Sequence, residues 1–171
     1  STDGSLGIIG RHEREISRII SEPDRGPVFA INKGLRMASG EIVAWLNADD
    51  RYRPGTLARV AETMDAHPDN ALCFGACPII DESGREIRRG ITRFKEAFFP
   101  VSSRFMIQCL NYVSQPAMFF RRSALEAVGL LREDMVAAWD YEFLLRLWRQ
   151  GGAALVPGGP LAEFRRHSDS I

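Results

Sequence analysis

The sequence predicts an α/β fold, in which helices flank a mixed, mostly parallel sheet. A nearly continuous apolar run at 42–46 has the pattern of a strand that is buried on both faces. Helical patterns precede and follow this run, at 28–38 and 57–64, and such alternation of helix and strand is typical of α/β folds. A length of 171 residues is sufficient for one domain with a hydrophobic core, and we expect a single domain at 1–171.

Three helices are expected in the first half of the chain. Isoleucines spaced three and four apart predict the first helix at about 13–20. The second spans 28–38 and ends at Gly40, and the third begins near Pro54 and ends before Pro68. The residues of the third helix that are expected to face the core are Leu57, Val60, Ala61 and Met64.

Further strands are expected after residue 70. Residues 71–80 resemble another buried strand, and the polar turn at 81–84 leads into a hairpin that continues through 85–91. Residues 117–120 are also apolar enough for a strand, and weaker strand patterns lie near the end of the chain. These weaker patterns are at 153–156 and 161–164.

Two helices are expected between these strands. Ser123 and Glu126 have the spacing of a capping box, which predicts a helix start. The last long helix covers about 140–150 and ends at Gly151-Gly152. Its inward residues are expected to be Phe143, Leu144, Leu147 and Trp148.

The composition excludes some classes of partner and compartment. Lys plus Arg and Asp plus Glu both number 22, so no net field attracts a polyanion, and we expect no nucleic-acid partner. Arginines cluster at 85–93 and 165–166, which suits a phosphate-bearing ligand or simply a solvated face. No apolar run is long enough to cross a bilayer, and three cysteines in apolar stretches are typical of reduced thiols. We therefore expect a soluble, cytoplasmic protein.

An acidic turn, Asn47-Ala48-Asp49-Asp50, follows the buried run at 42–46 directly. In open α/β sheets, ligands bind beyond the carboxyl ends of the strands. Two adjacent carboxylates there can bind Mg²⁺ or Mn²⁺, with diphosphate oxygens and water completing the shell. Taken in isolation, the same residues are equally explained as an ordinary turn, because Asp and Asn bond the local backbone.

A series of motifs surrounds this turn in a fixed order. They are SEPDRGP at 21–27, AINKGL at 30–35, ASGE at 38–41, LNADD at 46–50, QPAMFFRR at 115–122 and WDYE at 139–142. Together they resemble the family 2 glycosyltransferases. The resemblance implies a GT-A-type, Rossmann-like fold and inverting transfer of a sugar from a nucleotide-sugar, expected to be a UDP-sugar, to an acceptor hydroxyl. It also implies a role in cell-surface polysaccharide or lipopolysaccharide synthesis.

The resemblance implies a divalent cation, Mn²⁺ or Mg²⁺, as cofactor. In the family, the second Asp of the acidic turn binds the metal on the donor diphosphate, and this role carries over to Asp50. Asp49 would lie against the nucleotide-sugar. The segment Arg165-Arg166-His167-Ser168 resembles the family's closing RxH motif, whose histidine reaches the metal or the diphosphate, so His167 is a second candidate ligand.

The matching position for the family's catalytic base is Asp140, at the start of the late helix. Inverting transfer is a direct displacement, so a carboxylate must accept the proton of the acceptor hydroxyl as the new bond forms. Two alternatives remain open: Asp140 is an N-cap of its helix, or Glu142 is the base.

Four residues are expected to bind the donor. Asp24 and Arg25 match the family's loop beside the nucleotide, and Asn32 lies on the helix behind it. Asn32 can equally be structural, through hydrogen bonds to the backbone. Asp3 belongs to a TDGS stretch that resembles the tail of the family's DGSTDGS turn.

The chain departs from the family pattern at its front end. The family's first strand is missing, so we expect an N-terminally truncated fragment with a donor-binding half at about 1–80 and an acceptor-side half at about 81–171. Ser114 stands before Gln115, where many members of the family carry His.

The expected partners are the nucleotide-sugar donor and a saccharide or lipid-linked acceptor, with peripheral association at the inner face of the membrane through the acceptor. A noncatalytic nucleotide-sugar-binding fragment or scaffolding module is the alternative. A nucleotidyltransferase is disfavoured, because the sequence has no glycine-rich phosphate loop near its start.

Overall fold

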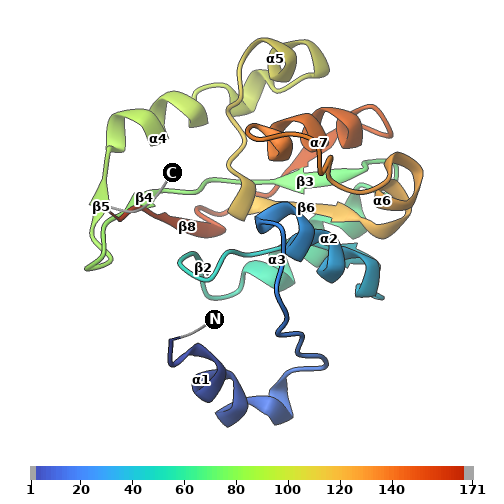
Figure 1. Ribbon diagram of the computed structural model, residues 1–171. Helices are drawn as coiled ribbons and strands as arrows, with labels where there is room; N and C mark the ends of the chain where they lie inside the picture. Colours follow the sequence, from blue (N-terminus) through green and yellow to red (C-terminus); the bar gives the residue numbers. More distant parts are fainter. Residues whose placement is uncertain (1–2, 168–171) are drawn as a thin grey trace.

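The computed structural model describes residues 3–167, which form two short mixed sheets with helices packed around them (Figure 1). The first sheet has the order β1-β6-β3-β7, and the second has the order β2-β8-β4-β5. The strands of the first sheet are β1 (Ile42–Val43), β6 (Met118–Arg121), β3 (Leu72–Phe74) and β7 (Ala153–Leu155). Those of the second sheet are β2 (Arg51–Tyr52), β8 (Ala162–Arg165), β4 (Ile79–Ile80) and β5 (Glu86–Ile87).

The mixed α/β architecture is confirmed, but the expected predominance of parallel strands is wrong for the described part of the chain. Strands β3 and β7 pair in parallel, as do β4 and β8. The other four described pairs are antiparallel, including both pairs that β6 makes. An apolar run indicates that a strand is covered on both faces, but it does not fix the direction of its neighbours.

The helices lie where most of the sequence patterns placed them. The longer ones are α2 (Pro27–Met37), α3 (Thr56–Ala66), α4 (Arg89–Glu96) and α7 (Trp139–Trp148). The shorter ones are α1 (Ser5–Arg11), α5 (Arg104–Cys109) and α6 (Arg122–Val128), with single 3₁₀ turns at Glu13–Glu15, Phe99–Val101 and Gln115–Ala117. No helix in residues 3–167 combines the length and the apolar character needed to cross a bilayer.

The helix expected at 13–20 is wrong. The chain forms α1 and one 3₁₀ turn earlier, and Ile16, Ile19 and Ile20 are between 37% and 49% exposed. In Figure 1, α1 stands clear of both sheets, and none of its residues is buried. Helical spacing stabilises a helix mainly when its apolar face packs on something, and this segment has no such surface in the described chain.

Helix α3 forms as expected, but with a different inward face. Val60 and Met64 are buried, whereas Leu57 is 63% exposed and Ala61 is exposed. The remaining buried positions are the threonines Thr56 and Thr63, whose hydroxyls donate to the carbonyl oxygens of Leu161 and Arg59. Burial of a polar side chain costs little when it is hydrogen-bonded, so threonine can replace the expected apolar residues.

Three further boundaries differ from the sequence pattern. Strand β1 covers only the first part of the run at 42–46, and the hairpin of β4 and β5 ends where α4 begins. The capping box is wrong, because Ser123 lies inside α6 and Arg121 is its N-cap.

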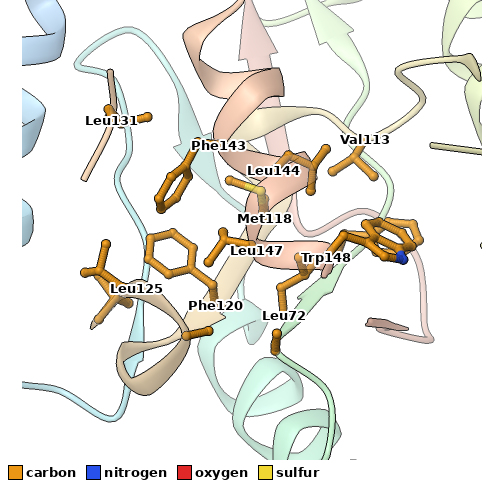
Figure 2. Packing of buried hydrophobic residues seen from close by; sticks show 14 of the residues in the cluster. Leu72, Val113, Met118, Phe120, Leu125, Leu131, Phe143, Leu144, Leu147 and Trp148 are labelled. Carbon is orange, nitrogen blue, oxygen red and sulfur yellow. The ribbon is translucent and has the colours of Figure 1, made fainter. Parts of the chain in front are cut away.

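The hydrophobic core lies on both faces of the first sheet. Along β6, Met118 and Phe120 face one cluster and Phe119 faces the other, as the alternation of side chains along a strand requires. Figure 2 shows the first cluster, in which Phe143 and Leu147 of α7 pack against Phe120. The rings of Phe120 and Phe143 meet edge to face, with centroids 5.3 Å apart. This packing fixes α7, and therefore Asp140, against the sheet.

Candidate functional site

The acidic turn is held from the far end of the chain. Asp50 is 7% exposed, and its Oδ1 accepts the backbone N–H of Arg165 at 2.9 Å while its Oδ2 accepts the Nδ2 of Asn47 at 3.2 Å. Burial raises the pKa of Asp50, the Arg165 amide opposes this change, and the neighbouring Asp49 charge adds to it. The carboxylate is therefore oriented before any ligand binds.

Strand β8 supplies this support through Arg165 as well. The Arg165 Nε donates to the carbonyl oxygen of Asp49 at 3.0 Å, and Nη1 donates to the carbonyl oxygens of Asp81 and Glu82, both at 2.9 Å. One side chain thus joins the acidic turn to the turn between β4 and β5. The cluster of arginines was visible in the sequence, but nothing in it indicated this structural role.

A buried ion pair reinforces the same junction. Glu163 of β8 is 5% exposed and binds two arginines that follow the acidic turn. Its Oε1 lies 2.9 Å from Arg53 Nη1, and its Oε2 accepts from Arg51 Nε. The pairing of β2 with β8 places Arg51 opposite Glu163, so the register of the strands brings these charges together.

His167 lies beside the acidic turn. Its Nε2 is 3.3 Å from Asp49 Oδ2, so the imidazole contacts the first carboxylate of the pair, while Asp50 is bound by β8. Within residues 3–167, no group of three or more His, Cys, Asp or Glu side chains is gathered closely enough to hold a metal. Two adjacent carboxylates and an imidazole do suit a cation that keeps water and substrate oxygens in its shell.

Asp140 lies in the first turn of α7, but it is not the N-cap. The N-cap is Ala138, a non-glycine residue with a φ of 57°, so the N-cap alternative for Asp140 is wrong. Left-handed backbone at a non-glycine residue is strained, and such strain clusters at functional sites. Glu142, the fallback base, accepts from Arg146 Nε at 2.8 Å. Arg146 also donates to the carbonyl oxygens of Val128, at the end of α6, and of Leu130.

Asp140 faces a small hollow that is also lined by Asn111, Gln115 and Tyr141. The Nε2 of Gln115 donates to the carbonyl oxygen of Trp45 at 2.8 Å, and Trp45 lies on the segment between β1 and the acidic turn. The segment after β1 and the hollow at Asp140 are therefore joined by one hydrogen bond.

Charge interactions also involve each of the two carboxylates. Burial raises the pKa of the Cys77 thiol, the charge of Asp50 raises it further, and the charge of Lys95 lowers it. Burial lowers the pKa of Lys95, and the charge of Asp140 opposes this change. Lys95 and Cys77 therefore carry charge interactions with Asp140 and Asp50, respectively. Sequence reasoning did not single out Lys95 or Cys77 for this position.

Two expected donor-binding residues lie in the loop before α2. Asp24 forms an ion pair with Lys33, which also pairs with Glu22 at 2.5 Å. The guanidinium of Arg25 lies over the ring of Phe29, 5.1 Å from its centroid. These contacts order the loop and leave Asp24 partly exposed.

Asp3 is exposed at the start of α1, where its Oδ1 accepts the backbone N–H of Ser5 at 3.1 Å. Hydrogen bonds from Ser5 lower the pKa of Asp3. Within the described residues, no hydrogen bond or ion pair joins Asp3 to the acidic turn.

Asn32 forms a structural clamp. It is 1% exposed, and its Nδ2 donates to the Leu131 carbonyl oxygen at 2.9 Å and to Glu133 Oε1 at 3.0 Å. Its Oδ1 accepts the Leu131 N–H at 3.0 Å. These bonds engage both ends of the amide, which favours the structural alternative for this residue.

A family model described as "Glycosyl transferase family 2" matches residues 1–129, about three quarters of the chain. The chain belongs to this family. It is 32% identical over 131 residues to the O-antigen biosynthesis protein RfbC of Myxococcus xanthus, a match that covers 76% of this chain and 10% of RfbC. The family assignment therefore rests on most of the present sequence.

Solved structures share the fold. The chain superimposes on S. aureus TarS 1-349 in complex with UDP-GlcNAc with a TM-score of 0.75 and 18% identity, covering 99% of this chain and 48% of TarS. It also matches the mannosyltransferase PcManGT of Pyrobaculum calidifontis, in complex with GDP-Man and Mn²⁺, with a TM-score of 0.64 and 22% identity. That match covers 95% of this chain and 44% of PcManGT, so the chain spans less than half the length of these proteins.

Proposed function

We propose that this family 2 glycosyltransferase chain forms the catalytic core of an inverting, metal-dependent enzyme that uses a nucleotide-sugar, with UDP-sugar as the expected donor. The observation that carries the proposal is the arrangement of the acidic turn. Asp50 is oriented by β8, His167 lies against Asp49, and Gln115, which bonds the segment ahead of the acidic turn, lines the hollow at Asp140. The complexes of TarS with UDP-GlcNAc and of PcManGT with GDP-Man and Mn²⁺ support this choice of donor and cation.

In this proposal, Asp50 and His167 would hold a divalent cation beside the donor diphosphate, and Asp49 would lie against the sugar. The cation, when bound, would offset the negative charge that develops on the leaving diphosphate. Asp24 and Arg25 contact the nucleotide, with Asp3 on the segment before them, and Asn32 positions α2 behind this loop.

Asp140 acts as the catalytic base. The acceptor oxygen forms a bond to the anomeric carbon while the bond from that carbon to the diphosphate oxygen breaks on the opposite face, which inverts the configuration. The proton of the acceptor hydroxyl passes to the Asp140 carboxylate while the acceptor oxygen forms its bond to the anomeric carbon.

The acceptor is a saccharide or a lipid-linked saccharide of a cell-surface polymer, and the enzyme meets it at the inner face of the membrane by peripheral association. The similarity to an O-antigen biosynthesis protein supports this class of acceptor. A noncatalytic nucleotide-sugar-binding module is the second candidate, because the chain spans less than half of the matched enzyme structures.

Calorimetric titration of UDP-GlcNAc in the presence of Mn²⁺ tests the donor site. We expect binding to the unmodified chain, loss of binding in Asp50→Ala, and retained binding in the control Asp65→Ala, which removes an exposed carboxylate from α3. Equal binding by Asp50→Ala and Asp65→Ala would contradict the assignment of Asp50.

Asp140→Asn separates an enzyme from a binding module. We expect it to bind donor like the unmodified chain but to release nucleoside diphosphate on the order of 10²–10⁴-fold more slowly, the usual contribution of a general base. If the unmodified chain binds donor and turns none over with any acceptor offered, the binding-module alternative is favoured instead.

A further inference from the structure

Lysine is rare in this chain, and one of its lysines lies beside the candidate site. Only two of the 22 basic residues are lysine, Lys33 and Lys95, and the other 20 are arginine. The ammonium group of Lys33 pairs with Glu22 and Asp24 at the loop before α2. Lys95 lies on α4, which is drawn above β4 and β5 in Figure 1, and its side chain is partly buried.

The ammonium group of Lys95 has one hydrogen-bond partner in the described structure. Its Nζ donates to Ser114 Oγ at 3.1 Å, and no carboxylate within residues 3–167 lies close enough to form an ion pair with it. An ammonium carries three N–H donors, so one hydroxyl leaves two of them without a protein acceptor. Burial of a charge without a counterion is unfavourable, and burial accordingly lowers the pKa of Lys95.

Within the described residues, no protein counterion offsets the cost of this partial burial. A bound anion would offset it. Nearly all basic residues of this chain are arginine. Lysine differs from arginine in presenting a compact point charge, which suits a single phosphate oxygen.

The position of Lys95 indicates which ligand it would meet. Ser114 precedes Gln115, which lines the hollow at Asp140 and bonds the Trp45 carbonyl oxygen ahead of the acidic turn. Against the lowering by burial, the charge of Asp140 raises the pKa of Lys95, and the charges of Lys95 and Asp50 both affect the pKa of the Cys77 thiol. The hydrogen bond to Ser114 therefore places the ammonium group next to the residue that lines the hollow at Asp140 and bonds the segment ahead of the acidic turn.

We propose that Lys95 is a substrate-binding residue whose ammonium group binds an anionic phosphate oxygen of the substrate between the acidic turn and Asp140. This inference rests on the proposed function and adds a protein cation to the metal site. The phosphate belongs either to the diphosphate of the donor or to a phosphorylated acceptor. Ser114 orients the ammonium group by accepting one of its hydrogen bonds.

The two lysines allow a direct test by NMR. Protein grown with lysine labelled with ¹³C at the ε carbon gives one signal from each lysine, and Lys95→Met assigns them. Pyrophosphate, UDP with Mg²⁺, and glycerol 3-phosphate are added in separate titrations. We expect the Lys95 signal to shift with at least one of them at saturable concentrations. A shift with pyrophosphate and UDP identifies the donor as the source, and a shift with glycerol 3-phosphate that persists in the presence of UDP identifies the acceptor.

Binding measurements on variants provide the second readout. We expect Lys95→Met to weaken binding of the responding ligand by about 10- to 100-fold, the range for a charged hydrogen bond, and Lys95→Arg to recover part of it. Arg93→Met removes an exposed cation from the same helix and should leave the affinity unchanged. Thermal unfolding of the three variants confirms that each is folded.

The outcomes separate this inference from the proposed function. If UDP binds through Asp50 while the Lys95 signal stays fixed in all titrations and Lys95→Met binds normally, the role of Lys95 is refuted and the proposed function stands. If UDP does not bind but pyrophosphate shifts the Lys95 signal, the proposed function fails and Lys95 remains an anion-binding residue. If no ligand binds or shifts the signal, both fail.

Discussion

Replacement of Asn32 distinguishes a donor contact from a structural clamp. Asn32→Ala removes three hydrogen bonds and leaves the backbone N–H and carbonyl oxygen of Leu131, a residue 3% exposed, without these partners. Each unsatisfied buried group costs about 1–3 kcal/mol, so we expect a loss of about 3 kcal/mol in the free energy of unfolding. At about 2–4 °C per kcal/mol for a chain of this size, the melting temperature should fall by roughly 6–12 °C.

Circular dichroism during heating measures this change, and Arg36→Ala is the matched control. Arg36 makes the other contact from α2 to Glu133, an ion pair of 3.6 Å between side chains that are 54% and 38% exposed. Such an exposed pair contributes about 0–1 kcal/mol. An Asn32→Ala protein that melts like the control, and binds donor more weakly than it, would refute the structural role.

Two further predictions concern buried charge and buried thiols. Glu163→Gln keeps the side-chain volume but removes the charge that binds two half-exposed arginines. We expect urea unfolding to show a loss of about 1–3 kcal/mol in the free energy of unfolding. A loss below about 0.5 kcal/mol would contradict a stabilising role of the buried ion pair. At pH 8 the exposed Cys109 should react with a thiol reagent at once, and Cys73 and Cys77 only on unfolding, because burial raises their pKa from 9.0 to about 12. The stability that these two thiols contribute is complete below pH 9 and declines as the pH rises from 9 toward 12, because the thiols lose their protons at lower pH in the unfolded chain than in the folded one. A free energy of unfolding that stays constant over this range would contradict the raised pKa values.

The fold was predictable from the sequence where local patterns and packing agree. The spacing of Phe143, Leu144 and Leu147 predicted the inner face of α7, and all three are buried. The spacing of Ile16, Ile19 and Ile20 was equally helical, yet it gave no helix, because periodicity describes a face and not whether a partner surface exists.

The candidate site was predictable in part for a different reason. The resemblance placed Asp49, Asp50 and His167 in one region, and the structure brings His167 to the acidic turn. The contact of the Arg165 amide with Asp50 spans 115 positions, and such a contact leaves no local signal in a sequence. The rarity of lysine among many arginines was visible in the sequence. Its relevance at Lys95 became apparent only from the contacts of that side chain in the structure.

The support of Asp50 by β8 has a consequence for how such a chain can be divided. The segment that matches the family model ends at residue 129, before both β7 and β8 begin. A protein that ended at that boundary would keep all residues of the acidic motif but would lose the Arg165 backbone amide that orients the Asp50 carboxylate. The residues that identify the motif and the residues that orient its carboxylate therefore belong to different stretches of polypeptide, and the end of β8 supplies the second.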